Sequence, residues 1–469
     1  MAKGGWDEKP KTASQFQQRV SQAFGRKASS KASNSLTAQL RFWWLRAVTI
    51  SAMLYIITSQ ALLGIGGWSL LGFVFAILLA VLLAAGRLLG LLNLEVGRWI
   101  WIPCFFVGYC ILRSFSGLQY SDPLDVLSAL VSAYLGGIGV AAALQTGMRF
   151  RALVYAQLVS SLCQIGAGFY GVGTEPAPPE TEVRYAGLTG NANEFGLQLT
   201  LGACLIWLLP RRAGIAGCCF AFIAAAYAVT TSGSRQALFV GFMFLVIVIV
   251  QAVAMTKKHR PLLVGSLIGA LVLAGAFLGP LLLDRARDVK SIQRAMEFET
   301  DSSYHKRLGM VEQGLRLWEQ APLLGNGLDA FRGLSGEGTY AHNNFMEVLC
   351  DLGVAGALLF YAIHGRIILN ALRLTGASRL SCLLFILLLL ALDMASVGYK
   401  RKQTVMVLMV LMAMTGIPVP ESRQKRSIQY YQVPRLARGG RTPWSRTLAD
   451  ASHTGCGTEG EAIVEGGQP

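Results

Sequence analysis

One histidine and two arginines are the residues of this sequence best suited to carry chemistry. His342 directly precedes the apolar run in AHNNFMEVLCDLGVAGALLFY, and an imidazole, with an ordinary pKa of about 6.5, can accept a proton at neutral pH. Arg235 and Arg307 carry guanidinium groups, which bind phosphate oxygens with a planar fork and stay charged at any physiological pH. The sequence therefore supplies one candidate base and two candidate anion-binding groups.

Each of these residues also has a purely structural interpretation. Asn344 and Glu347 have the spacing of a capping box, in which case His342 is a polar residue in front of a helix. Arg235 follows TTSGS at the start of an apolar segment, where an interfacial anchor is as reasonable as an anion site. Arg307 begins an amphipathic stretch and could lie on a solvated face. Spacing alone leaves both interpretations open.

Several other polar residues are candidates for a supporting role. Glu347 and Asp351 lie four positions apart on one helical face, where either could orient an imidazole or pair with an arginine. In GLTGNANE, Asn193 could present an amide to a sugar, although we favour a helix N-cap there. Lys400, Arg401 and Lys402 form a cationic run near Asp393, which suggests an anionic partner. The supporting candidates are Asn193, Asn343, Glu347, Lys400 and Arg401.

Long apolar helices must position these residues. The chain has 469 residues, of which 53% are hydrophobic and 14% charged, whereas a soluble protein carries about 25% charged residues. Apolar blocks of about 20 residues recur, the length that crosses a bilayer as a helix. We therefore predict an all-α, polytopic integral membrane protein with about twelve transmembrane helices. The predicted segments are 43–63, 68–92, 99–113, 123–144, 150–171, 187–209, 213–231, 235–255, 261–283, 343–367, 378–398 and 402–418.

The charge distribution predicts the topology and the domains. The net charge of +16 does not require a nucleic-acid partner, because most lysines and arginines fall in short loops that would all be cytoplasmic if both termini were inside. Only the run Lys400–Lys402 breaks this rule clearly. The predicted parts are a disordered basic cytoplasmic tail (1–42), a transmembrane domain (43–418) and a second disordered basic cytoplasmic tail (419–469).

Two outer loops are long enough to carry structure of their own. Residues 172–186 are rich in proline and glutamate and are predicted to form a solvated connector. In the outer loop 284–341, apolar residues from Leu308 to Trp318 recur at helical spacing, which predicts an amphipathic helix on the outer membrane surface that ends before Pro322.

Missing motifs narrow the chemistry further. The sequence has no phosphate-binding loop GxxxxGK[ST], no GxSxG, no HExxH and no paired-cysteine zinc spacing. The outer loops also contain no closely spaced DxD pair for a divalent ion. We therefore expect a metal-independent reaction without a cofactor.

Four strings in order resemble a known family. GLTGNANEFG, TSGSRQALFVG, YHKRLGMVEQGLRLWEQAPLLGNGLDAF and AHNNFMEVLCDLGVAGALLFY are together similar to the O-antigen ligase and O-antigen polymerase superfamily of bacterial membrane glycosyltransferases. The resemblance covers about residues 185–365. It implies transfer of a glycan from a polyprenyl diphosphate donor to an acceptor hydroxyl at the periplasmic face of the inner membrane, in O-antigen, capsule or exopolysaccharide synthesis.

The resemblance also implies roles for individual residues. The family's loop histidine corresponds to His342, and its two arginines to Arg235 and Arg307, which would bind the diphosphate. An inverting displacement would follow. The acceptor, which could be a lipid, a protein or another lipid-linked glycan, decides between ligase and polymerase, and the sequence leaves that choice open with a slight preference for polymerase.

Two functions from other classes remain as alternatives. A secondary transporter commonly has twelve spans and would need ionisable groups near the bilayer midplane, for which Asp393 is the main candidate. A glycan-assembly scaffold without activity would need neither Arg235 nor Arg307.

Overall fold

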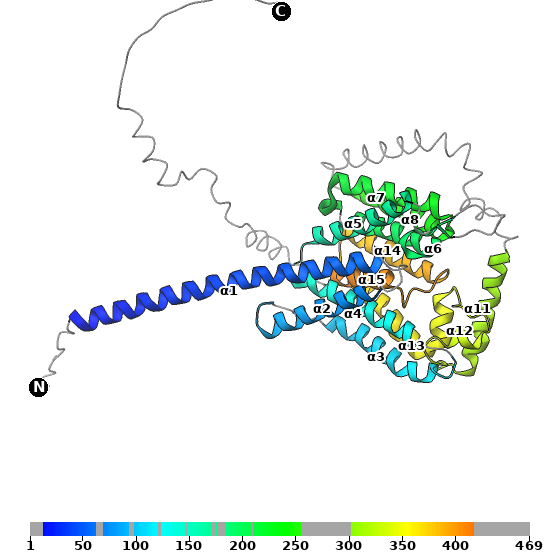
Figure 1. The fold of residues 1–469 in the computed structure, drawn as a ribbon, viewed down its shortest axis with the longest axis horizontal. Helices are drawn as coiled ribbons and strands as arrows, with labels where there is room; N and C mark the ends of the chain where they lie inside the picture. The colour runs from blue at the N-terminus through cyan, green and yellow to red at the C-terminus, as the bar shows by residue number, and fades with distance from the viewer. Residues whose placement is uncertain are drawn as a thin grey trace, which may run out of the picture. The chain divides into compact units, whose positions relative to one another are not determined.

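The computed structural model describes residues 13–416, except 62–68, 93–97, 121–122, 147, 171–173, 176–183, 209 and 255–301. This part of the chain is helical apart from one two-stranded ladder (Figure 1). The helices are α1 (Ala13–Ala61), α2 (Ser69–Leu88), η1 (Arg98–Ile100), α3 (Trp101–Gly117), α4 (Leu124–Thr146), α5 (Phe150–Phe169), η2 (Gly187–Thr189), α6 (Ala192–Leu208), α7 (Pro210–Ser232), α8 (Arg235–Ala254), α11 (Ser302–Gln320), α12 (Ala330–Leu334), α13 (Asn344–Ala371), α14 (Gly376–Asp393) and α15 (Lys402–Thr415).

The predicted all-α membrane class agrees with this architecture. Each predicted apolar segment among the described residues coincides with a helix whose ends differ by a few residues, except that α1 begins 30 residues before the predicted start of segment 43–63. Segment 261–283 lies outside the described residues. Four of the helices are long and apolar enough to cross a membrane: Leu36–Gln60, Leu70–Leu88, Leu124–Thr146 and Asn344–Ala371. Shorter apolar helices accompany them.

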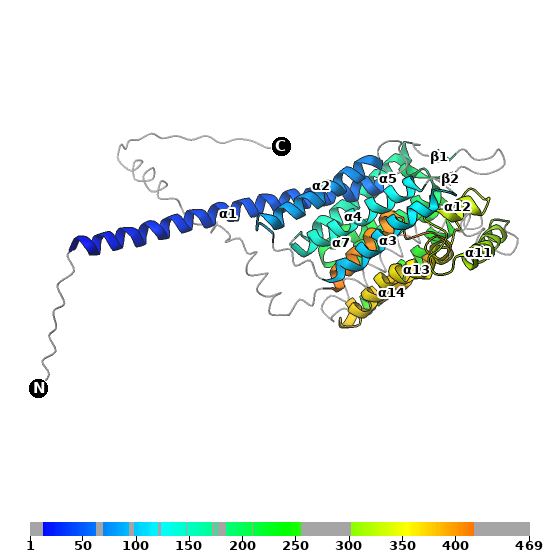
Figure 2. The same cartoon turned by 90° about the horizontal axis from the view of Figure 1, so that it is seen from below.

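Helix α1 extends into residues 1–42, the segment predicted to be a disordered basic cytoplasmic tail. The helix begins at Ala13 and continues into the apolar segment (Figure 2). The stretch from Ala13 to the apolar segment contains no proline and many good helix formers such as Ala, Gln, Lys and Arg. Extending an existing helix costs far less than nucleating one, so a stretch without a hydrophobic face can still be helical. The predicted tail 419–469 lies outside the described residues.

The predicted connector 172–186 contains the only strands of the described residues. Strand β1 (Thr174–Glu175) pairs antiparallel with β2 (Arg184–Tyr185). The outer loop contains the predicted amphipathic helix as α11, which ends at Gln320, before Pro322. Its buried face, with Met310 and Leu317, packs next to Phe331 and Cys350, whereas Leu308 and Leu315 on the predicted apolar stripe are exposed.

Helix α13 is broken at Gly353, where φ is 66° and ψ is −171°. In a continuous helix the next two N–H groups, of Val354 and Ala355, would donate to the carbonyls four residues earlier. Here they donate to Pro322 O (2.9 Å) and Leu323 O (3.1 Å) in the loop after α11. A Cβ at Gly353 would overlap the Leu323 carbonyl, so glycine is required at the break.

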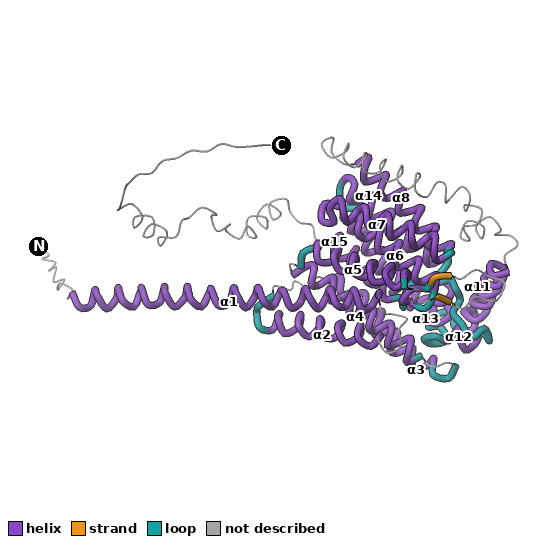
Figure 3. The backbone as a smooth tube through the Cα atoms, turned by 45° about the horizontal axis from the view of Figure 1, so that its top comes forward, coloured by secondary structure: helices purple, strands orange, loops and turns teal. Residues whose placement is uncertain are grey.

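The same loop also satisfies the carbonyls that the break leaves free. Asn326 N donates to Cys350 O and Gly327 N to Asp351 O, each at 2.8 Å. A Cβ at Gly325 would overlap the Asp351 carbonyl. The exchange pairs these two N–H groups and two carbonyls with the loop and fixes the loop against α13, at the end of the bundle where Figure 3 labels α11, α12 and α13.

Candidate functional site

Four helix N-termini converge at this end of the bundle. Arg401, which precedes α15, pairs with Glu194 in the first turn of α6 (3.3 Å). Lys400 pairs with Glu347 in the first turn of α13 (2.6 Å). Gln236, the second residue of α8, donates to Ala395 O in the α14–α15 connection (2.6 Å). Because a helix N-terminus carries partial positive charge and free N–H groups, this end of the bundle is suited to bind an anion.

His342 lies at this end of the bundle, just before α13. Its φ is 53°, in the left-handed region that a non-glycine residue seldom adopts. The imidazole is half-buried against Tyr340, with ring centroids 4.2 Å apart. The next residue, Asn343, caps α13 through a hydrogen bond from Met346 N (3.1 Å). The backbone conformation of His342 is therefore held by the start of the helix.

Burial and three neighbouring cations keep this imidazole neutral. Partial burial, followed by the positive charges of Arg307, Arg401 and Lys306, lowers the pKa of His342 to about 4. At neutral pH the ring is therefore unprotonated and able to accept a proton. The same electrostatic contacts place the predicted residues Arg307 and Arg401 in the surroundings of His342.

A buried ion-pair network lies behind His342. Lys400 Nζ contacts Glu347 Oε1 at 2.6 Å and Asp329 Oδ1 at 3.4 Å. Burial alone would lower the pKa of Lys400, but the adjacent carboxylates raise it above its usual value, so the side chain stays charged. The second Glu347 oxygen accepts the N–H of Ala341 at 2.8 Å. Glu347 thus joins Lys400 to the residue that precedes His342.

The Asp351 carboxylate binds the outer loop. It is fully buried and accepts hydrogen bonds from Asp329 N (3.1 Å), Phe331 N (2.9 Å) and the Tyr399 hydroxyl (3.2 Å). The prediction that Asp351 could orient an imidazole or pair with an arginine is not what the structure shows. The carboxylate instead binds the first turn of α12 to α13.

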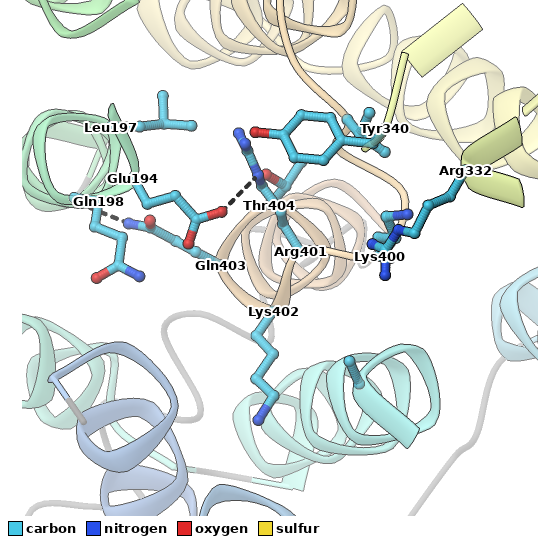
Figure 4. A pocket seen from close by; sticks show the side chains of 12 residues that line it. Glu194, Leu197, Gln198, Arg332, Tyr340, Lys400, Arg401, Lys402, Gln403 and Thr404 are labelled. Atoms are coloured by element: carbon cyan, nitrogen blue, oxygen red, sulfur yellow. Dashed lines mark hydrogen bonds and ion pairs between the residues drawn. The ribbon is translucent and has the colours of Figure 1, made fainter. Parts of the chain in front are cut away.

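A pocket of about 320 Å³ opens beside this network (Figure 4). Its lining residues come from α4, α6, α12, the segment before α13, the α14–α15 connection and the start of α15: Ala129, Glu194, Leu197, Gln198, Arg332, Tyr340, Val397, Lys400, Arg401, Lys402, Gln403 and Thr404. Figure 4 shows Arg401 extending towards Glu194, whereas Lys402 points the other way. Lys402 Nζ lies close to Gly72 in α2, so the predicted run Lys400–Lys402 is divided between different surroundings.

Some of the predicted site residues lie at this end of the bundle without lining the pocket. Arg235 is the first residue of α8, as predicted. Its neighbour Gln236 donates a hydrogen bond to the carbonyl of Ala395. The carbonyl of the adjacent Met394 accepts from Asn343 Nδ2 (3.4 Å). Asn193 lies in the first turn of α6, next to Glu194. Neither Arg235 nor Arg307 is among the residues that line the pocket.

Both predicted helix caps are wrong by one or two residues. Asn343, not Asn344, caps α13. The Asn344 side chain instead accepts from Gly398 N (2.8 Å) and Tyr399 N (3.0 Å). At α6 the side chain of Asn191, not Asn193, accepts from the N–H groups of the first turn. Since runs such as HNN and NAN offer several equivalent caps, the tertiary partner decides which one is used.

Sequence reasoning missed Asp329, Arg332, Asn344 and Tyr399. Arg332 lines the pocket and pairs with Asp329 at 3.5 Å, while Asn344 and Tyr399 hold the α14–α15 connection against α13. The string GNGLDAFR, with two glycines followed by oppositely charged residues, was the available signal for the first pair. No periodic pattern marks the other two residues.

A segment that runs from α7 into α13 matches a known family. Residues 220–361 match the family model described as O-antigen ligase. The matched region includes Arg235, Arg307, His342 and Glu347, while Lys400 and Arg401 lie beyond it. No curated protein matches the chain.

Proposed function

We propose that this helical membrane protein, whose residues 220–361 match the O-antigen ligase family model, transfers a glycan from a polyprenyl diphosphate donor to an acceptor hydroxyl at the periplasmic face of the bacterial inner membrane. The family is one of enzymes of surface polysaccharide biosynthesis with lipid-linked glycan substrates. The proposal adds the reaction, its face of the membrane and the residues that carry it.

The observation that carries this proposal is the neutral imidazole among cations. His342 has a pKa of about 4 and lies near Arg307 and Arg401, at an end of the bundle where four helix N-termini meet. A base and an anion site must be adjacent if a hydroxyl is to attack a carbon that carries a diphosphate. A site with only one of the two could bind a donor without activating an acceptor.

The proposed reaction is a single displacement. The acceptor oxygen bonds to the anomeric carbon of the donor while the bond from that carbon to the diphosphate oxygen breaks, and its electron pair leaves with the lipid diphosphate. His342 accepts the proton of the acceptor hydroxyl. Arg235 and Arg307 stabilise the developing negative charge. Attack opposite the leaving group inverts the sugar carbon, and the arginines supply the charge that a divalent ion would otherwise supply.

The supporting residues keep His342 in place. Asn343 caps α13 directly after His342, and Glu347 binds the N–H directly before it. Lys400 holds Glu347 and Arg401 adds positive charge, whereas Asn193 lies at the edge of the site beside Glu194. We propose four of these residues as positioning or charge-setting residues of the reaction: Asn343, Glu347, Lys400 and Arg401.

Glycan analysis of cells tests the proposal. In cells that depend on this chain, His342→Ala is expected to abolish the polymerised or ligated surface glycan while the protein remains in the membrane at its normal level. His305→Ala is the matched control, because His305 is an exposed histidine on α11. Unchanged glycan in His342→Ala would exclude His342 as the base.

The contacts of Asp393 bear on the transporter alternative. Asp393 is the last residue of α14, and its carboxylate accepts a hydrogen bond from the Tyr361 hydroxyl (3.4 Å). The same hydroxyl oxygen accepts a hydrogen bond from Asn344 Nδ2 (3.1 Å). These contacts tie Asp393 to the same end of the bundle as His342. Uptake of solute into proteoliposomes that is lost in Asp393→Asn would favour transport instead.

A further inference from the structure

We propose that the pocket beside His342 binds the carboxylate of an acidic sugar in the glycan, through Arg332 and Arg401. The inference rests on the proposed function and specifies its substrate class. This carboxylate subsite, defined by Arg332, Arg401 and the pocket between them, is separate from the arginines assigned to the diphosphate, since neither Arg235 nor Arg307 lines the pocket.

Arg332 and Arg401 reach the pocket from different elements. Arg332 belongs to α12 of the outer loop, and Arg401 precedes α15 (Figure 4). Each forms an ion pair with a carboxylate through Nε: Arg332 with Asp329 Oδ2 at 3.5 Å, without a hydrogen bond between these atoms, and Arg401 with Glu194 Oε1 at 3.3 Å. The guanidinium groups are thus oriented before any ligand arrives.

The held arginines keep hydrogen-bonding capacity for a ligand. Because both ion pairs use Nε, the terminal Nη groups remain to donate elsewhere. Nη1 of Arg401 is buried and has no hydrogen-bond partner among the described residues. A buried guanidinium nitrogen without an acceptor is costly, and a carboxylate oxygen in the pocket would remove that cost.

The charge around the pocket suits a singly charged group better than a diphosphate. Lys400 is already neutralised by Glu347 and Asp329. Glu194 and Asp329 also lie next to the two arginines and would repel a ligand that carries several negative charges. A carboxylate, with a single negative charge, can bind both guanidinium groups while it is repelled least by Glu194 and Asp329.

The rest of the lining is suited to a sugar ring. Gln198, Gln403 and Thr404 offer polar groups for hydroxyls, and Leu197 and Val397 offer apolar surface. The volume, about 320 Å³, is at the lower end of the range for small-ligand sites, about 300 Å³ and above.

The pocket also adjoins the proposed base. Tyr340 lines the pocket and its ring contacts that of His342, with centroids 4.2 Å apart and the ring planes tilted by 49°. A sugar bound in the pocket would therefore lie next to the group that accepts the proton of the attacking hydroxyl. An acidic sugar in the reacting part of the glycan is the ligand that uses all of these features.

Binding of a matched pair of oligosaccharides tests the inference. The full chain, purified in detergent, is titrated with a hyaluronan tetrasaccharide and with the same tetrasaccharide after its carboxylates have been reduced to alcohols. The wild-type protein is expected to bind the acidic form about tenfold more tightly, the effect of one charge-assisted contact. Arg401→Gln and Arg332→Gln are each expected to remove most of that preference.

The controls separate this inference from the proposed function. Arg316→Gln removes an exposed arginine paired with Glu312 on α11 and should keep the preference. Arg401→Lys keeps the charge but not the fork, so it should fold normally and bind the acidic form less tightly. Equal wild-type affinity for the two forms, or a preference that survives both Arg→Gln variants, would overturn the inference.

Titration with inorganic pyrophosphate tests whether the pocket binds the diphosphate of the donor instead of a sugar carboxylate. If Arg332→Gln and Arg401→Gln weaken pyrophosphate binding but leave the tetrasaccharide preference unchanged, the pocket belongs to the diphosphate and the inference is wrong. The titrations need no turnover, so their outcome is independent of whether His342→Ala abolishes glycan transfer.

Discussion

His342 depends on its neighbours both for its charge and for its position. Burial, Arg307, Arg401 and Lys306 keep the ring neutral, while Asn343 and Glu347 hold the backbone on either side of it. The sequence could identify the histidine and the arginines as chemically capable groups. It could not predict that Glu347 pairs with Lys400, because the two residues approach each other only through the packing of α13 against the start of α15.

The first prediction concerns the pH dependence of transfer. Since the reactive form is the neutral imidazole and the pKa of His342 is about 4, kcat/KM should fall only as the pH approaches that value from above. Removing a nearby positive charge makes protonation easier, so Arg307→Gln should raise the pKa and move the acidic limb of the profile to higher pH. Arg316→Gln, on the same helix but exposed, should leave the limb unchanged. An acidic limb at the same pH in Arg307→Gln would contradict this electrostatic account.

The second prediction concerns the buried ion pair. Removing one partner of a buried pair leaves the other charge uncompensated and costs about 3–5 kcal/mol, so Glu347→Gln and Lys400→Met should each lower the unfolding temperature strongly. The double variant should cost clearly less than the two single changes together. The exposed pair Glu312–Arg316 is the control and should contribute about 1 kcal/mol or less. Strictly additive losses for Glu347 and Lys400 would show that the pair is not coupled.

At the scale of elements, the docking of the loop 322–327 into the broken helix α13 fixes the outer loop. The helices themselves could be predicted, because apolar blocks of membrane-spanning length are a strong signal. The break could not, since DLGVAG reads as an ordinary apolar helix. Gly353 shows its role only when the carbonyl of Leu323 is seen to occupy the space of a side chain.

The third prediction tests this docking. Gly353→Ala places a Cβ against the Leu323 carbonyl at a backbone with φ 66°, which should cost at least about 1–3 kcal/mol and lower the unfolding temperature. Gly365→Ala is the matched control, because it lies in the same helix with nothing within 4 Å of the new Cβ. Proteolysis of the outer loop should accelerate in Gly353→Ala only. Equal stability of the two variants would refute the proposed role of the break.

At the scale of the whole molecule, the proposal requires the His342 end of the bundle to face the outside. The positive charges of the short loops favour this orientation, and Arg87, near the end of α2, is an exposed residue predicted to lie inside. The order of the apolar helices was accessible from the sequence. The predicted topology also placed the starts of α6, α8, α13 and α15 on one side, but it did not predict which of these helices are neighbours, because that depends on packing.

The fourth prediction follows from this orientation. In intact spheroplasts, a membrane-impermeant maleimide should label Arg316→Cys on α11 well above the background of the native cysteines. Arg87→Cys should be labelled only after the membrane is opened. Labelling with the opposite pattern would place His342 on the cytoplasmic side and exclude a periplasmic reaction.

The most direct test of the central claim separates donor binding from transfer. Purified wild-type protein and His342→Ala are compared in proteoliposomes with a labelled polyprenyl diphosphate glycan and its acceptor, in the presence of EDTA. The account predicts that both proteins bind the donor, and that transfer by the wild type persists in EDTA. Transfer by His342→Ala should fall by about 10²-fold or more, the usual loss of a general base. Equal transfer rates for the two proteins would contradict the account.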